Sequence, residues 1–350
     1  MAQITHRTVQ TNGINMHIAE AGSGPLVVMC HGWPESWYSW RHQLTALADA
    51  GYHAVAPDQR GYGTTTAPEG IDQYTQFHLV GDIVGLLDAL GEETAVVAGH
   101  DWGAPVAWNC ALLRPDRFTG VIALSVPYLP RQGSAVGAPG ADMGWAGATR
   151  PTDLMRQNFG DRFFYQLHFQ TPGVAEHEFQ NDVRRTMKLI LYGAGGEGVF
   201  ARVSTAGAAA AELPPATAFM LQGMNDPETL PAWLSDEDID FYANEFRQAG
   251  FRGGINWYRN IDRNWELMGA YAGAKITQPA LFMTGDLDVV YLSMARAAVD
   301  NLEASVPNLR TKIILPGVGH WTQQERPAEV NAAMIEFLES VTKGAALAAV

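Results

Sequence analysis

The sequence predicts an α/β fold in which a mostly parallel sheet is flanked by helices and carries a helical insertion. Three observations favour this architecture. Short, valine-rich apolar segments recur along the chain, stretches with helical periodicity separate them, and this alternation stops in the middle of the chain. A strand that is covered by helices on both faces is apolar on both sides, and alternating strands and helices form parallel βαβ units.

The first part of the sheet domain is expected over residues 1–128. The predicted strands are Pro25–Cys30, His53–Ala56, Thr94–Ala98 and Val121–Val126. The predicted helices are Ser36–Ala50, Tyr74–Leu90 and Ala104–Leu113. The last of these helices should end at Arg114-Pro115, because proline cannot continue a helix.

A helical cap is expected over residues 129–265. Gly133–Gly147 is rich in Gly, Pro and Ala and is typical of a loop or hinge. Asp161–Gln170 and Asp236–Ala249 have helical patterns, aromatic residues are frequent, and no strong strand appears before about Lys275.

The sheet domain should resume over residues 266–350. The expected strands are Ala280–Met283 and Thr311–Leu315, and the expected helices are Leu292–Leu302 and Pro327–Val341. The whole chain then forms one sheet domain with a cap inserted into it.

Composition restricts the class of protein and its partners. The chain has 350 residues, 47% hydrophobic, which is enough for a large core. The formal net charge is -14 and no block is rich in Lys and Arg, which argues against nucleic acid as a partner. The two cysteines, Cys30 and Cys110, lie in apolar stretches, which excludes a disulfide scaffold and favours a reducing compartment.

The N-terminus has neither the basic start nor the apolar run of a signal peptide, and no segment reaches the roughly 18 apolar residues of a membrane span. We therefore expect a cytoplasmic protein with no membrane partner. Whether it is a monomer or a homodimer cannot be read from the sequence.

The strongest chemical signal is Gly99-His100-Asp101-Trp102-Gly103, which joins a predicted strand to a predicted helix. Small residues two before and two after a nucleophile permit a sharp turn that lifts its side chain above the sheet. An aspartate at this position can also simply cap the following helix. We expect the His100 side chain to turn away from Asp101 and to pack.

The order of further motifs favours the nucleophile. Gly285-Asp286-Leu287-Asp288 and Gly319-His320-Trp321 follow two later strands, so nucleophile, acid and histidine occur in the chain order of a hydrolase triad. Asp286 and Asp288 compete as the acid, because both follow the same strand. The loop His31-Gly32-Trp33-Pro34 can aim the Trp33 N–H, together with the Trp102 N–H, at one oxyanion.

These motifs resemble the epoxide hydrolases of the α/β-hydrolase fold, over essentially the whole chain. The cap segments Phe164-Tyr165-Gln166-Leu167 and Asn256-Trp257-Tyr258-Arg259-Asn260 are similar to the soluble epoxide hydrolase pattern. The resemblance implies that Asp101 is the nucleophile, His320 the base, Asp288 its orienting acid, and Tyr165 with Tyr258 the ring-opening acids. It also implies a stand-alone hydrolase domain without the additional phosphatase domain of vertebrate relatives.

The chemistry of the residues is consistent with this resemblance. A carboxylate is ionised at pH 7 and suits displacement at an sp³ carbon, since attack on an acyl group would give a reactive anhydride. Epoxide opening expels an alkoxide, and a tyrosine stays protonated until that charge develops. The expected substrates are a small apolar epoxide and water, without cofactor or metal.

Two alternatives remain at this stage. A haloalkane dehalogenase shares the fold and the Asp-Trp-Gly continuation, but it usually has Asn where Trp33 stands and lacks the tyrosine pair. A non-catalytic binding protein on the same fold is expected to have lost a member of the triad, and here none is missing.

Overall fold

The computed structural model describes residues 2–131, 149–206 and 214–348. Eight strands form one sheet in the order β1-β2-β4-β3-β5-β6-β7-β8. Their bounds are β1 Thr5–Thr11, β2 Ile14–Ala21, β3 Leu26–Cys30, β4 His53–Pro57, β5 Ala95–His100, β6 Phe118–Leu124, β7 Ala280–Gly285 and β8 Leu309–Leu315. Strands β3 to β8 run parallel, which confirms the predicted mostly parallel sheet.

The antiparallel hairpin β1–β2 was not among the predicted strands. Most residues of β1 are exposed and β2 mixes buried with partly or fully exposed positions, so the hairpin lacks the continuous apolar run that marks the inner strands. Asn12 and Gly13 form its turn with φ of 45° and 79°. An Asn-Gly pair between alternating segments is a strong hairpin signal, and it was available in the sequence.

The inner strands are buried on both faces because helices cover each side of the sheet. In β3, Val27 and Met29 join the core that contains α1 (Arg41–Asp49) and α15 (Pro327–Ala348). Val28 and Cys30 point the other way, into the core that contains α2 (Gln76–Leu90) and α3 (Gly103–Leu113). This period of two explains why the strand is continuously apolar.

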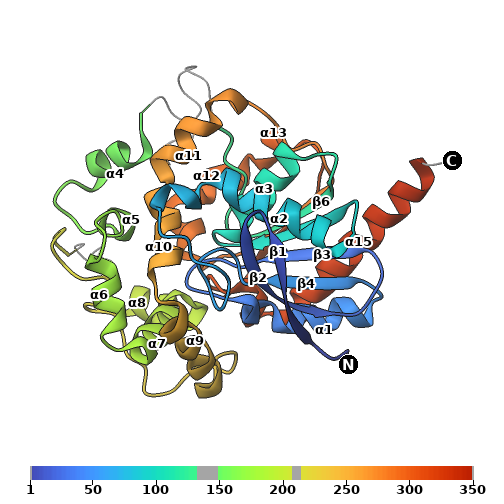
Figure 1. Ribbon diagram of the computed structural model, residues 1–350. Helices are drawn as coiled ribbons and strands as arrows, with labels where there is room; N and C mark the ends of the chain where they lie inside the picture. The colour runs from blue at the N-terminus through green and yellow to red at the C-terminus, as the bar shows by residue number, and fades with distance from the viewer. Residues whose placement is uncertain (1, 132–148, 207–213, 349–350) are drawn as a thin grey trace.

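Helices occupy the chain between β6 and β7, and Figure 1 shows them gathered on one side of the molecule. They are α4 Pro151–Phe159, α5 Tyr165–His168, α6 Val174–Gln180, α7 Val183–Ala194, α8 Gly196–Ala206, α9 Asp236–Ala249, α10 Arg252–Arg259 and α11 Ile261–Leu267, followed by the 3₁₀ helix η3 Met268–Tyr271. This arrangement is consistent with the expected cap, whose exact boundaries stay a prediction. The predicted hinge Gly133–Gly147 lies entirely within residues 132–148, outside the described residues.

Two predicted helices are wrong in extent. Asp161–Gln170 is helical only at Tyr165–His168, because Gly160 (φ 54°) ends α4 and the following chain is extended, with Arg162 paired to Pro215. Leu292–Leu302 is interrupted: a π-helical turn (η4, Tyr291–Ala295) precedes the short helices α12 (Arg296–Asp300) and α13 (Leu302–Ser305).

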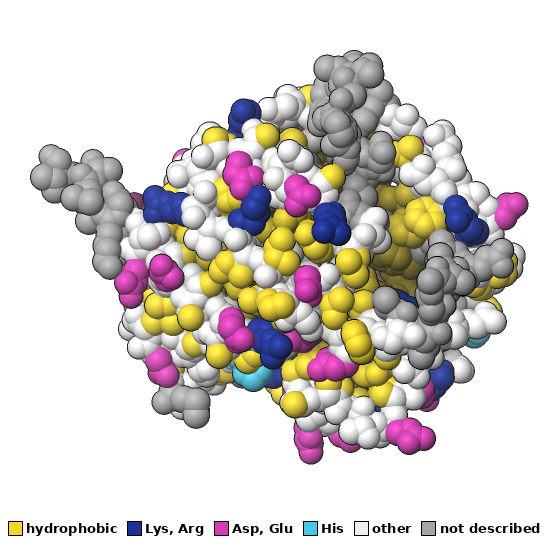
Figure 2. All heavy atoms as spheres, turned by 180° about the vertical axis from the view of Figure 1, so that it is seen from behind, with side chains coloured by type: hydrophobic (Ala, Val, Ile, Leu, Met, Phe, Trp, Pro, Cys, Tyr) yellow, Lys and Arg dark blue, Asp and Glu magenta, His cyan; other side chains and the backbone are white. Residues whose placement is uncertain are grey.

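The remaining short elements are the 3₁₀ helices η1 Trp37–Trp40 and η2 Ile71–Tyr74 and the helix α14 Thr322–Glu325. Within the ranges that the structure describes, no helix combines the length and the apolar character needed to cross a bilayer. On the face shown in Figure 2, acidic and basic side chains are scattered singly rather than gathered into a basic block.

Candidate active site

Asp101 lies in a tight turn between β5 and α3, with a φ of 49° that is unusual for a residue with a side chain. The turn requires the flanking glycines. A Cβ on Gly99 would lie 2.0 Å from the Gly103 carbonyl oxygen, and a Cβ on Gly103 would lie 2.0 Å from the Cys30 carbonyl oxygen. Helix α3 has no side-chain hydrogen bond at its N-cap, so Asp101 does not have the capping role that its position in the sequence also allowed.

The structure brings Asp101, His320 and Asp288 together at the carboxyl ends of the strands. His320 Nδ1 lies 3.0 Å from Asp288 Oδ1, and His320 Nε2 lies 3.5 Å from Asp101 Oδ2. Asp288 is fully buried and also accepts hydrogen bonds from the Val290 amide (2.8 Å) and the Thr284 hydroxyl (3.1 Å). Asp286 instead accepts a hydrogen bond from the Gly317 amide, so of the two competing aspartates it is Asp288 that contacts His320.

Pairing between the charged side chains shifts the pKa values of Asp288 and His320. Burial alone would raise the pKa of Asp288, but His320 and the hydrogen bonds from His320, Ser125 and the Val290 amide hold it below its usual value. Burial alone would lower the pKa of His320, but Asp288 and Asp101 together hold it well above its usual value. The resting site therefore favours a charged imidazolium between two carboxylates.

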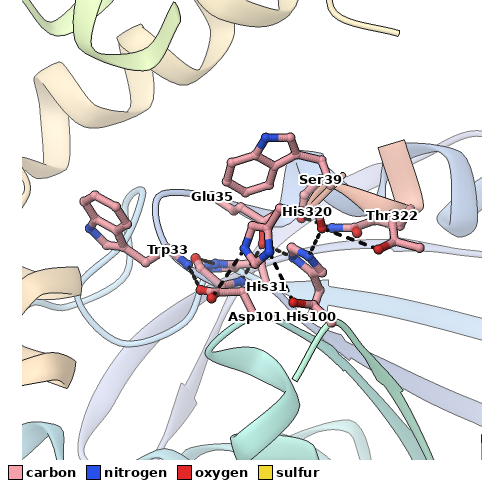
Figure 3. A network of polar contacts seen from close by, with 12 residues as sticks. His31, Trp33, Glu35, Ser39, His100, Asp101, His320 and Thr322 are labelled. Atoms are coloured by element: carbon pink, nitrogen blue, oxygen red, sulfur yellow. Dashed lines mark hydrogen bonds and ion pairs between the residues drawn. The ribbon is translucent and has the colours of Figure 1, made fainter. Parts of the chain in front are cut away.

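The loop from His31 to Pro34 forms the wall beside Asp101, and its Trp33-Pro34 peptide bond is cis. The Trp33 N–H donates to Asp101 Oδ1 at 2.7 Å (Figure 3). A Cβ on Gly32 would lie 2.4 Å from the same oxygen, so only glycine permits this approach. The loop thus aims a backbone donor at the carboxylate; that the Trp33 and Trp102 N–H groups form an oxyanion hole stays a prediction.

Polar residues that the sequence did not reveal support the triad. Glu35 is fully buried and accepts from the Gly32 N–H (2.7 Å) and from Gln323 Nε2 (3.0 Å). His100 turns from Asp101 as expected, but it does more than pack. Its Nδ1 contacts Glu35 Oε2 at 2.8 Å and its Nε2 contacts the His320 carbonyl oxygen at 2.7 Å (Figure 3).

Ser125 is a second unforeseen neighbour of the triad. It is fully buried, has a φ of 71°, and places its hydroxyl 3.1 Å from His320 Nδ1. It follows β6 (Phe118–Leu124), so its position at a strand end was a usable signal. Ser125, Glu35 and His100 together fix both the ring and the backbone of His320.

The two tyrosines come from separate cap helices. Tyr165 begins α5, Tyr258 lies on α10, and their ring centroids are 5.8 Å apart. Burial is the main reason that the pKa of each phenol is raised, so both hydroxyls keep their proton at neutral pH. Gln166 Nε2 donates to the Tyr165 oxygen at 2.9 Å, and the Tyr258 ring packs edge-on against Trp102.

One cavity contacts the carboxylate and both tyrosines. Asp101, Trp102, Tyr165 and Tyr258 all line it, and most of its other walls are apolar. Its volume is about 120 Å³. A single water needs only about 10–15 Å³ on this measure, so an organic molecule of several heavy atoms fits.

Comparison with known proteins agrees with this geometry. Residues 25–327 match the family described as alpha/beta hydrolase fold. Epoxide hydrolase A of Mycobacterium tuberculosis is 45% identical over 340 residues, covering 97% of this chain and 98% of the relative.

Solved structures of epoxide hydrolases are also similar to this chain over nearly its whole length. Epoxide hydrolase A from Mycobacterium thermoresistibile is similar with a TM-score of 0.84 and 46% identity, covering 96% of this chain and 98% of that one. An epoxide hydrolase from an endophytic Streptomyces reaches a TM-score of 0.87 at 44% identity, covering 97% and 96%. With its fold, its site geometry and these full-length similarities, the chain belongs to the epoxide hydrolase family of the alpha/beta hydrolase fold.

Proposed function

We propose that this enzyme converts apolar epoxides to vicinal diols through an ester on Asp101. The observation that carries the proposal is the cavity that the Asp101 carboxylate lines together with the phenols of Tyr165 and Tyr258. Relatives that are at least 40% identical over nearly the whole chain are named as epoxide hydrolases. The tyrosine pair also separates this chemistry from halide displacement, which needs no proton donor.

In the first step, a carboxylate oxygen of Asp101 attacks one epoxide carbon and the carbon–oxygen bond of the ring breaks. Tyr165 or Tyr258 donates a proton to the departing alkoxide, so the product is a neutral hydroxyalkyl ester and one tyrosinate. The Trp33 N–H, which hydrogen-bonds Asp101 Oδ1 at 2.7 Å, orients the carboxylate for this attack.

In the second step, the His320 imidazolium first returns a proton to the tyrosinate, and the neutral ring then removes a proton from water, so that the hydroxide attacks the ester carbon of Asp101. The negative tetrahedral oxygen is stabilised by the N–H groups of Trp33 and Trp102. Collapse releases the second diol oxygen and regenerates the carboxylate. The expelled alkoxide takes the remaining water proton, and the proton that His320 took from water restores its resting imidazolium, so the sum is epoxide plus water to diol.

The charges around His320 support this order of steps. Asp101 is one of the two carboxylates that hold the pKa of His320 high. Esterification removes the charge on Asp101, so the pKa of His320 falls when the base is needed. Asp288, fully buried behind the ring, keeps the imidazole oriented in both states.

The test is diol formation from styrene oxide by the purified protein, with Asp101→Asn as the variant. We expect diol from the wild type and a loss of at least about 10³-fold in the variant, since a neutral amide is a poor nucleophile. Halide release from a chloroalkane is measured in parallel. Undiminished diol formation by Asp101→Asn, or halide release without diol formation, would refute the proposal.

A further inference from the structure

The substrate cavity contains a second polar site besides Asp101 and the two tyrosines. Gln76 is the first residue of α2, Asn264 lies on α11, and both line the same cavity as Asp101. Gln76 is 2% exposed and Asn264 is 1% exposed. Both side-chain amide atoms of Gln76, and Nδ2 of Asn264, have no hydrogen-bond partner among the described residues.

Buried amides almost always hydrogen-bond, so these atoms call for an explanation. The orientation of Asn264 is fixed, because its Oδ1 accepts the Gln76 backbone N–H at 2.8 Å. Its Nδ2 must then point away from that bond as a donor. Much of the cavity lining is apolar and includes Trp108, Val126, Met268 and Val290.

Other polar side chains of the cavity have partners of their own; Asn109 Nδ2, for example, donates to the Pro105 carbonyl oxygen. Gln166 Nε2 donates to the Tyr165 oxygen at the reactive end, where Gln166 Oε1 has no partner among the described residues. The Arg131 guanidinium lies 3.8 Å from the Trp265 ring centre, and its Nε donates to the Trp265 carbonyl oxygen. Gln76 and Asn264 are therefore a separate amide pair within an apolar wall.

We propose that Gln76 and Asn264 form a subsite for a hydroxyl group on the substrate, so that hydroxylated epoxides are preferred over alkyl epoxides of equal length. A hydroxyl can donate to Gln76 Oε1 and accept from Asn264 Nδ2 or Gln76 Nε2. An ether or a carboxylate only accepts, and either would leave Gln76 Oε1 without a donor. The inference rests on the proposed function, because it names the substrate class of that site.

The test compares kcat/KM for 1,2-epoxyoctane with a series of analogues that carry one hydroxyl at successive chain carbons. The methyl ether and the carboxylate of the best position are included. We expect the best alcohol to be preferred over 1,2-epoxyoctane by about tenfold, the size of one or two net hydrogen bonds. Neither the ether nor the carboxylate should reach the value of the alcohol.

Two variants test the residues. Gln76→Met keeps the length and removes both polar groups, and Asn264→Asp keeps the acceptor for the Gln76 N–H while removing the donor. Either change should reduce the alcohol preference to within about twofold. Gln73→Met is the matched control, because Gln73 is exposed and lies outside the cavity wall; its preference should equal that of the wild type.

Three outcomes would overturn the subsite: no alcohol preferred by more than about twofold, an ether or carboxylate as good as the alcohol, or a preference that both variants retain. Failure of the proposed function is a different result, namely no diol from 1,2-epoxyoctane by the wild type. In that case the subsite is tested by comparing the affinities of the protein for octane-1,8-diol and for 1-octanol, with binding monitored by tryptophan fluorescence. Equal affinities, or a difference that Gln76→Met leaves unchanged, would then refute it.

Discussion

Replacing Asp288 with Asn removes the negative charge behind His320 while keeping its shape. The Asn oxygen can still accept from His320 Nδ1 and from the Val290 amide, where Asp288 Oδ1 stands at 3.0 Å and 2.8 Å. The new NH₂ group can donate to the Thr284 hydroxyl, 3.1 Å from Asp288 Oδ2. The substitution therefore tests charge with little change of packing.

The loss should fall on ester hydrolysis. Asp288 is the leading charge that raises the pKa of His320, so its removal makes His320 a weaker base and a less stable imidazolium. General-base catalysis is worth about 10²–10⁴ in rate, and we expect kcat to fall about 10³-fold, which corresponds to about 4 kcal/mol. Ester formation does not use His320 as a base and should change much less.

The assay mixes enzyme with styrene oxide and follows tryptophan fluorescence and the mass of the intact protein. We expect rapid consumption of one epoxide per enzyme, an alkylated protein that accumulates, and slow release of diol. Asp286→Asn is the matched control, since Asp286 follows the same strand but its carboxylate accepts from the Gly317 amide rather than pairing with His320, and the variant should behave as the wild type. A kcat within tenfold of wild type for Asp288→Asn, or slowed ester formation without accumulation, would refute the reasoning.

Two further predictions concern the phenols and pH. Tyr165→Phe and Tyr258→Phe should each slow ester formation, and the double variant should lose at least about 10²-fold in single-turnover rate with its fold intact; a double variant that alkylates at the wild-type rate would contradict the role of the pair. Burial, together with the nearby Asp58 charge, raises the pKa of the Glu245 carboxyl to about 7. The folded state therefore binds this proton more tightly than the unfolded state, and the protein loses stability as pH rises from about 4.5 to 7. Because Glu245 is partly exposed, Glu245→Gln should add only on the order of 1 kcal/mol at pH 8 and nothing at pH 4 in urea unfolding; an equal effect at both pH values would exclude this linkage.

The sheet and the triad could be predicted because both depend on local pattern and on topology. Buried parallel strands are apolar on both faces, and their carboxyl ends meet at one edge, which brings Asp101, Asp288 and His320 together. Hairpin β1–β2 was missed because its mixture of buried and exposed residues gives a weaker signal than an apolar run.

The supporting residues depend on contacts that no local pattern carries. Glu35 and His100 are 65 residues apart in sequence, and Gln76 and Asn264 are 188 apart. Neither pair stands in a motif that specifies a partner, so each becomes visible only when the loops and cap helices are folded against the sheet. The lengths of cap helices were equally hard to predict, because a long-range pairing of Arg162 with Pro215 competes with helix formation.

The central claim is that Asp101, and not water, attacks the epoxide. It is tested most directly by hydrolysis in ¹⁸O-water with enzyme in excess over styrene oxide, so that each site turns over once. If Asp101 supplies the oxygen, the diol is unlabelled and the label is found in the peptide that contains Asp101. A diol that carries ¹⁸O on this first turnover, with an unlabelled Asp101 peptide, would contradict the covalent mechanism.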